Sequence, residues 1–152
     1  DETFAEGHDL EIGGRHIEIR HPAGAHTPGD SFVWLPEESV LFAGDIVYVG
    51  RILGVMEFSN TADWLEAFAA IEALEPAHLV PGHGPATTLA QAQADTRDYL
   101  LNLRSQMRDY IDAGGDIIGS VDVDQSDFAY LDQFDALAGR NAQAAFAEME
   151  WE

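Results

Sequence analysis

Three segments of the sequence place a side chain that can bind a metal ion within two residues of glycine or proline. They are residues 25–30 with His26, residues 42–45 with Asp45, and residues 81–84 with His83. Small neighbouring residues let a metal ion approach, and loops at strand ends carry functional side chains on a rigid sheet. Because the sequence contains no cysteine, a metal would have to be bound through imidazole nitrogen and carboxylate oxygen. The three residues therefore predict a metal site built from histidine and aspartate.

Each of these residues also has a purely structural explanation, because Asp and His often stabilise turns through hydrogen bonds. Asp45 follows His26 by 19 positions, and His83 follows Asp45 by 38. These separations are too long for a local finger-type site, so the three side chains can converge only through the tertiary fold. Thr27 and Asp30, which flank the first histidine, are interpreted as residues that shape a turn.

The pattern around the three residues predicts a strand-rich first part of the chain. The apolar runs that predict strands are 10–12, 16–19, 31–35, 40–42, 46–49 and 79–80. Gly13-Gly14 lies between the first two, as in a tight β-hairpin. The prolines and glycines of residues 81–85 are not expected in a regular element, which places His83 on a loop.

Helical spacing of apolar residues predominates in the rest of the chain. It predicts helices over residues 61–74, 88–113, 128–134 and 141–149. Asn60 or Thr61 is suited to begin the first helix, and Gly114-Gly115 to end the second. The same spacing makes Trp64 a core residue, whereas Glu57, Tyr48 and Phe58 are candidates for lining a substrate pocket.

The composition favours one compact domain over residues 1–152, with a strand-rich part (1–86) that carries the candidate ligands and a helical part (87–152). The chain has 152 residues, of which 46% are hydrophobic, and a net charge of −21. Such a charge repels phosphate backbones and anionic lipid, so we expect no nucleic-acid or membrane partner. With no apolar stretch near the ~18 residues of a membrane helix, we expect a soluble protein. The absence of cysteine fits the cytoplasm and the periplasm equally well.

Taken in order, the three segments resemble the second half of the metallo-β-lactamase superfamily. That pattern is His-Thr-Pro-Gly, then a strand ending in Gly-Asp, then Pro-Gly-His-Gly. Here it occurs at residues 26–29, 41–45 and 80–84, and the resemblance covers about residues 10–103. Arg140-Asn141 resembles the tail of the branch that includes SoxH-like and quinoprotein-relay zinc hydrolases.

The resemblance implies a fold and a role for each ligand. It implies an α/β (α+β) fold that forms the second half of an αββα sandwich, with a mostly antiparallel or mixed sheet and covering helices. His26 would bind the first of two zinc ions, His83 the second, and Asp45 would bridge both metals and help to hold the hydroxide. A half sandwich leaves an apolar sheet face bare. We therefore expect a homo-oligomer, or association with a segment that supplies the first half.

The early motif of that family, His-x-His-x-Asp-His, does not occur in the 152 residues. His8, His16 and His21 do not reproduce its spacing and are interpreted as surface or hairpin residues, and His78 as a connector between helix and strand. Three ligands cannot complete a dinuclear site, so this chain alone is expected to be inactive.

Three hypotheses on function follow from these residues and from the resemblance. The first is a zinc-dependent hydrolase in the full-length form, which opens a small-molecule ester, lactone, thioester or lactam with metal-activated water. The second is an iron-dependent oxidoreductase on the same fold, because the same ligands accept iron. The third is a non-catalytic folded fragment that self-associates.

Overall fold

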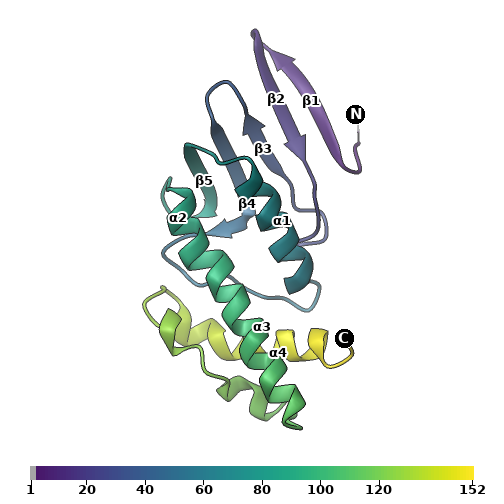
Figure 1. Cartoon of the computed structure of the whole chain (residues 1–152), viewed down its shortest axis with the longest axis vertical. Helices are drawn as coiled ribbons and strands as arrows, with labels where there is room; N and C mark the ends of the chain where they lie inside the picture. Colours follow the sequence, from purple (N-terminus) through teal and green to yellow (C-terminus); the bar gives the residue numbers. More distant parts are fainter. Residues whose placement is uncertain (1–2) are drawn as a thin grey trace.

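The computed structural model of the chain describes residues 3–152 as a five-stranded sheet with one helix between its last two strands and a group of helices after it (Figure 1). The strands are β1 (Gly7–Ile12), β2 (Arg15–Arg20), β3 (Phe32–Leu35), β4 (Val40–Tyr48) and β5 (His78–His83). The helices are α1 (Thr61–Ala73), α2 (Leu89–Ala92), the π-helical turn η1 (Gln93–Arg97), α3 (Asp98–Asp112), the short 3-10 turns η2 (Gly119–Asp122) and η3 (Ser126–Phe128), and α4 (Phe134–Met149). This mixed α/β architecture is the fold class predicted from the sequence.

The strands lie in the sheet in their order along the chain. The first four pair antiparallel, and β5 pairs parallel with β4 after the crossover through α1. The predicted hairpin is confirmed, because β1 and β2 are joined by Gly13 and Gly14 with φ angles of 61° and 80°. Positive φ at both positions favours glycine in such a turn.

The two apolar runs 40–42 and 46–49, predicted as separate strands, belong mostly to one strand, β4, with an irregularity in its middle. The register of β4 against β5 shifts on either side of Gly44, whose φ of 54° is positive. Glycine adopts this conformation without steric strain, so the strand bends and continues instead of ending. Asp45 therefore lies within β4, immediately after the bend.

The prediction that residues 81–85 form a loop is wrong for their first part, because β5 continues through Pro81 and Gly82 to His83. The strand follows the bend of β4, with Pro81 opposite Gly44 and His83 opposite Tyr48. It lies at the edge of the sheet, where a proline without an N–H group is tolerated. His78 is the first residue of this strand and not a connector before it.

Helix α1 covers one face of the sheet (Figure 1). It begins at the predicted position, where the Asn60 side chain accepts a hydrogen bond from the backbone N–H of Asp63. Trp64, Phe68 and Ile71 are fully buried and belong to the same core as the sheet. Side chains alternate between the two faces of a strand, and those on the opposite face are partly exposed: Val33, Leu35, Val40, Phe42 and Val80.

The predicted helix over 88–113 is present as three consecutive pieces, α2, η1 and α3. The wider π turn directs Asp95 and Thr96 at the end of β4, and π turns often mark functional positions. The Thr96 hydroxyl contacts both the N–H and the carbonyl of Tyr48. The Asp95 carboxylate accepts from the N–H of Gly50.

The helix predicted over 128–134 is wrong, and α4 begins at Phe134, before the predicted 141. Two backbone hydrogen bonds explain the difference, because the N–H of Asp132 donates to the Gly50 carbonyl and the Asp132 carbonyl accepts from the N–H of Ile52. A residue whose backbone pairs with another segment cannot also continue a helix. Phe128 and Leu131 are nevertheless buried, which accounts for the apolar pattern.

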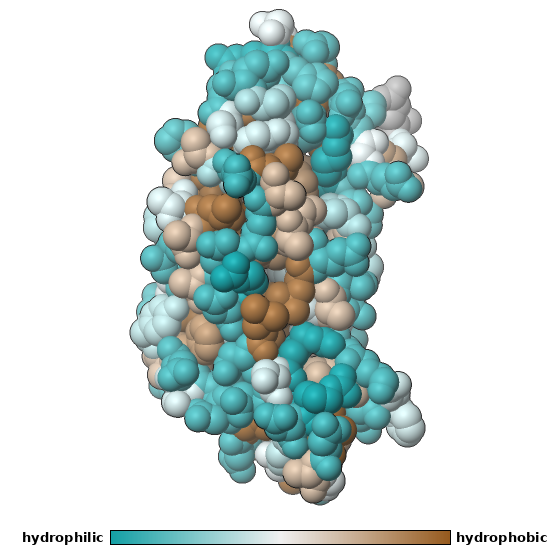
Figure 2. Space-filling model, in the orientation of Figure 1, coloured by the Kyte–Doolittle hydropathy of each residue, from teal (hydrophilic) through white to brown (hydrophobic). Residues whose placement is uncertain are grey.

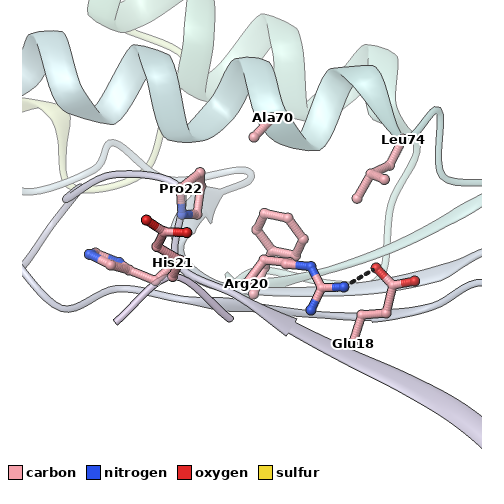
Figure 3. A pocket seen from close by; sticks show the side chains of 8 residues that line it. Glu18, Arg20, His21, Pro22, Ala70 and Leu74 are labelled. Atoms are coloured by element: carbon pink, nitrogen blue, oxygen red, sulfur yellow. Dashed lines mark hydrogen bonds and ion pairs between the residues drawn. The ribbon is translucent and has the colours of Figure 1, made fainter. Parts of the chain in front are cut away.

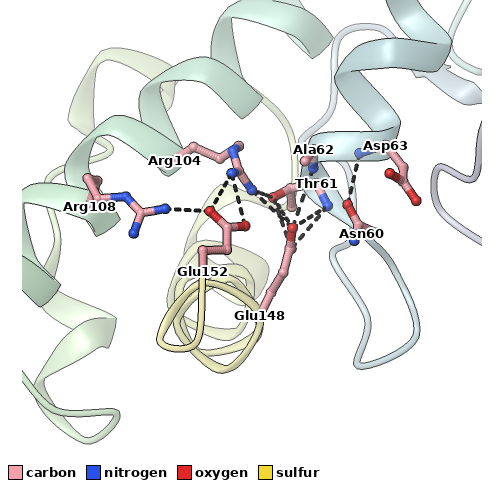
Figure 4. Close-up of polar contacts among 8 residues, drawn as sticks. All are labelled: Asn60, Thr61, Ala62, Asp63, Arg104, Arg108, Glu148 and Glu152. Carbon is pink, nitrogen blue, oxygen red and sulfur yellow. Dashed lines mark hydrogen bonds and ion pairs between the residues drawn. The ribbon is translucent and has the colours of Figure 1, made fainter.

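A polar network joins the C-terminal end of α4 to α1 and α3 (Figure 4). The Glu148 carboxylate accepts hydrogen bonds from the backbone N–H and the hydroxyl of Thr61, at the start of α1, and pairs with Arg104 of α3 at 3.0 Å. Glu152 pairs with Arg104 and Arg108. A carboxylate at a helix N-terminus satisfies free N–H groups and the helix dipole. The last helix is thus fastened to the layer that covers the sheet.

Hydrophilic surface predominates at both ends of the molecule, and the larger apolar patches lie near the middle of this view (Figure 2). This distribution agrees with the net charge of −21. None of the helices between residues 3 and 152 combines the length and the hydropathy that a bilayer crossing requires.

Candidate metal centre

Asp45 and His83 lie close together at one end of the two parallel strands. The Nε2 atom of His83 is 3.7 Å from Oδ1 of Asp45, and both side chains are about 40% exposed (40% and 38%). The parallel pairing brings them there, because the carboxyl ends of β4 and β5 share one edge. The imidazole nitrogen and the carboxylate oxygen are both open to solvent and are close enough together to contact one cation.

Gly82 is what allows β5 to pass Asp45. A Cβ atom on Gly82 would lie 2.6 Å from both the carbonyl carbon and the carbonyl oxygen of Gly44, and closer still to Oδ1 of Asp45. Real Cβ atoms do not approach backbone atoms so closely. The glycine before His83 in the sequence is therefore required by the approach of the two strands at the candidate site.

His26 lies in the loop between β2 and β3, and two sets of hydrogen bonds hold it. Asp30 closes the loop, since its carboxylate accepts from the N–H of Thr27 at 2.9 Å and from the Thr27 hydroxyl at 2.8 Å. These two residues shape the turn, as the sequence indicated. The His26 ring uses Nδ1 to reach the carbonyl of Gly54 at 2.9 Å. A carbonyl oxygen only accepts hydrogen bonds, so Nδ1 carries the proton of the neutral ring. Nε2 is then unprotonated, and its lone pair can bind a metal ion.

Tyr48 separates His26 from the other two candidate ligands. Its ring stacks on His83, with centroids 4.6 Å apart, and lies 6.2 Å from the ring of His26. Burial, the charge of Asp45 and a hydrogen bond with Asp45 raise the pKa of the Tyr48 hydroxyl above its ordinary value. Because Tyr48 is only 3% exposed, it packs against the candidate ligands and has almost no surface with which to line a substrate pocket, contrary to the prediction.

The other aromatic candidates also lie beside His26. Phe58 contacts the His26 ring edge-on at 6.2 Å and is half exposed, so it is free to meet a substrate. Trp64 lies 5.9 Å from the same ring but is fully buried, as its helical spacing predicted. Glu57 lines a shallow surface hollow beside α4.

The structure brings the three predicted ligands to the same end of the sheet, around Tyr48. Within residues 3–152, however, no three His, Asp or Glu side chains are arranged to hold one metal ion. Imidazole nitrogen and carboxylate oxygen suit zinc and iron, so the donor types fit, and each metal would need further donors. The assignment of His26, Asp45 and His83 as ligands stays a prediction.

The remaining histidines are engaged elsewhere. His8 and His16 lie on β1 and β2, and a hydrogen bond that the Glu11 carboxylate accepts from Nδ1 raises the pKa of the His16 imidazole. Nδ1 of His21 lies 2.7 Å from the carbonyl of Asp30. The positions of the first two are those of hairpin residues.

A larger hollow lies away from the predicted ligands, between α1 and strands β2 and β3 (Figure 3). Its lining includes Phe32 and Leu74, and at its rim Arg20 pairs with Glu18 at 2.9 Å. Arg20 also pairs with Asp9, so its charge is already matched. The hollow contains none of the three predicted ligands.

Sequence comparison connects this geometry with known proteins. The sequence profile of the Metallo-beta-lactamase superfamily matches residues 1–83, which include all three predicted ligands. The chain belongs to this superfamily. It is 30% identical over 82 residues to the acyl-coenzyme A thioesterase MBLAC2 of Gallus gallus, an alignment that covers 51% of the chain and 29% of that protein. It is also 30% identical over 80 residues to the beta-lactamase-like protein 2 homolog of Caenorhabditis elegans, covering 53% of the chain and 26% of the relative. The chain thus spans less than a third of these relatives.

Solved structures show the same fold. A metallo-beta-lactamase from Pontibacter korlensis superposes with a TM-score of 0.60 and 29% identity, over 66% of the chain and 48% of the other protein. The sec-alkylsulfatase Pisa1 from Pseudomonas sp. superposes with a TM-score of 0.76 over 97% of the chain and 26% of that enzyme, at 16% identity. The second likeness extends the common fold to the C-terminal helices of this superfamily member.

Three buried residues in the core around the candidate metal centre make side-chain contacts that the sequence pattern did not reveal. Besides Tyr48, they are Tyr99 on α3 and Asn141 on α4, both buried and joined by a hydrogen bond of 2.9 Å. In the sequence, Asn141 stands out only in the pair Arg140-Asn141 of the family resemblance and as the first residue of the predicted helix over 141–149. A buried polar residue inside an apolar helical pattern was the available signal, since such residues require partners.

Alkaline pH is expected to destabilise the fold through Tyr99. Burial raises the pKa of its hydroxyl above the ordinary 10.0, so the folded state keeps a proton that the unfolded state loses. The contribution of Tyr99 to stability is complete below pH 10 and falls as the pH rises toward the folded pKa. Above pH 10, the Tyr99→Phe variant should lose stability less steeply, by about 1.4 kcal/mol per pH unit. Urea unfolding at stepped pH measures both slopes, and equal slopes would contradict the assignment.

Proposed function

We propose that this chain contributes His26, Asp45 and His83 to a dinuclear metal site of a hydrolase that cleaves a small acyl compound with metal-activated water. The observation that carries the proposal is the approach of His83 to Asp45, whose side chains lie 3.7 Å apart. Both residues belong to the part of the chain that matches the family profile. The hydrogen bond from His26 to the Gly54 carbonyl supports it, because metal-binding histidines commonly donate their other ring N–H to such a partner.

Bound zinc would lower the pKa of its water and so supply hydroxide at neutral pH. The residues of this chain would position the metal ligands for that reaction. His26 presents Nε2, the Asp45 carboxylate lies near the Tyr48 hydroxyl, and the His83 ring is stacked on Tyr48. Phe58, half exposed beside His26, offers an apolar surface for an acyl group.

Among the ester, lactone, thioester and lactam substrates, we propose a thioester first. The support is the 30% identity to an acyl-coenzyme A thioesterase over 82 residues. The loops that determine specificity in such folds vary independently of the ligands, so the assay must include the other classes.

The test compares this chain with a longer chain that also carries His-x-His-x-Asp-His. With zinc, the longer chain is expected to hydrolyse an acyl-coenzyme A thioester, and this chain alone is expected to do so no faster than buffer. Asp45→Asn in the longer chain should lower kcat by about 100-fold or more. Turnover that requires iron and a redox partner, or none with any added metal, would reject the proposal in favour of an oxidoreductase or a non-catalytic fragment.

We also propose that the sheet face opposite α1 is covered in the working protein, by the segment that supplies the first half or by a second copy. Phe42 in the centre of that face is 44% exposed, and its neighbours across the strands are Val33 and Val80. Sedimentation of this chain at micromolar concentration should show self-association, and a stable, well-folded monomer would count against the proposal.

A further inference from the structure

Asn141 of α4 forms hydrogen bonds with the backbone of residues 53–55, the segment that faces His26. It lies far from that histidine in the sequence. Its Oδ1 accepts from the N–H of Val55 at 2.9 Å, and its Nδ2 donates to the carbonyl of Leu53 at 2.8 Å. The Asn141 side chain is only 1% exposed. These two bonds hold the backbone on both sides of Gly54, whose carbonyl contacts His26.

The carbonyl of Gly54 and the N–H of Val55 belong to the same peptide group. A peptide group is planar and trans, so its C=O and N–H point in opposite directions and rotate together. Asn141 holds the N–H end of this plane, and His26 contacts the C=O end. Fixing one end therefore fixes the direction of the other.

The amide of Asn141 is itself held on its remaining side. Its Nδ2 donates a second hydrogen bond to the Tyr99 hydroxyl at 2.9 Å. That hydroxyl donates to Oε1 of Gln125 at 2.7 Å, and Nε2 of Gln125 donates to the carbonyl of Ala138 at 3.0 Å. Both N–H groups of Asn141 and its oxygen are thus in use, and consecutive hydrogen bonds of this kind polarise one another.

We propose that Asn141 is a positioning residue for His26, acting through the Gly54–Val55 peptide group. It keeps the Gly54 carbonyl directed at Nδ1, which holds the imidazole as the tautomer with a free Nε2. The inference rests on the proposed function, in which that Nε2 binds the metal. The wider consequence is that the last helix, outside the part of the chain that matches the family profile, takes part in the site.

The test is the protonation pattern of the His26 ring in the metal-free chain, measured by long-range proton–nitrogen NMR and assigned with His26→Gln. The parent chain is expected to show a protonated Nδ1 and a clearly separated, unprotonated Nε2. In Asn141→Ala the two nitrogen signals should move together, because the ring then exchanges between tautomers. An unchanged pattern in folded Asn141→Ala overturns the proposal.

Glu148→Gln is the matched control. It weakens another polar contact made by the same helix, the partly buried one to Thr61, without touching residues 53–55. It should lower stability and leave the His26 signals in place. If Glu148→Gln moves them as far as Asn141→Ala does, the effect is one of helix docking and the proposal fails.

Tyr99→Phe covers the case in which Asn141→Ala does not fold. It keeps the ring and removes only the hydroxyl that accepts from Asn141, so the His26 signals should shift in the same direction by a smaller amount. No shift in this variant overturns the proposal. Because all these spectra are recorded without metal, they are independent of whether the hydrolase assignment holds. In the longer chain, Asn141→Ala should additionally weaken zinc binding by about 10-fold or more.

Discussion

Replacing Gly82 with alanine is expected to force β5 away from β4 and to lower the free energy of unfolding by about 3 kcal/mol. The new methyl group would meet the Gly44 backbone at 2.6 Å, and backbone in the middle of a sheet cannot rotate aside as a side chain can. The nearest atom is Oδ1 of Asp45, so the carboxylate would be displaced from His83 as well. Urea unfolding measures the stability, and the chemical shift of the Asp45 carboxyl carbon reports the displacement.

Gly29→Ala is the control for this substitution. Gly29 lies beside the His26 loop, but a Cβ atom there would have no neighbour within 4 Å, and its φ is not in the positive range. The variant should stay within about 0.5 kcal/mol of the parent chain. Equal stability of the Gly82 and Gly29 variants would show that the strands do not approach as closely as described.

Replacing Trp64 with alanine is expected to cost about 4 kcal/mol of stability, the usual range for removing a fully buried large aromatic side chain. Trp64 is fully buried, and its indole N–H donates to the carbonyl of Ile46 at 2.9 Å. Its ring also supports His26 and Tyr48, at 5.9 and 6.2 Å. Thermal and urea unfolding should therefore show a large loss, together with altered ring signals of His26.

Two further variants separate packing from hydrogen bonding at this position. Trp64→Phe keeps most of the packing but leaves the Ile46 carbonyl without its donor, which should cost about 1–2 kcal/mol. Trp151→Ala removes the same side chain from a position that is 85% exposed, and should change stability by less than about 0.5 kcal/mol. A Trp64→Ala variant as stable as Trp151→Ala would contradict the assignment of Trp64 to the core.

Much of the fold could be predicted from local pattern. The hairpin was predicted from Gly13-Gly14. Helix α1 was predicted from Asn60 and from the helical spacing of Trp64, Phe68 and Ile71. The wrong predictions of secondary structure arose where backbone pairing with a distant segment overrides the local preference for a helix or a loop. Asp132 pairs with Gly50 and Ile52 and so interrupts a helical pattern. No count of apolar residues in a short window contains that information.

The candidate ligands could be proposed from the sequence, but the residues that contact and support them could not. His26, Asp45 and His83 stand out in the sequence because each lies within two residues of glycine or proline. Tyr48 and Asn141 were not identified as supports, because their roles depend on contacts with segments distant in the sequence. The hydrogen bond between Val55 and Asn141 joins residues 86 positions apart.

Contacts of such long range have a consequence for the order of folding during synthesis. The β1–β2 hairpin joins neighbouring residues and can form as soon as it leaves the ribosome, since short loops close at little entropic cost. The loop that faces His26 must wait for α4, which is translated on the order of ten seconds later. A nascent chain halted before residue 141 would already contain every predicted ligand and would still lack the helix that aims the first of them. Maturation of the site is therefore among the last events in the folding of this chain.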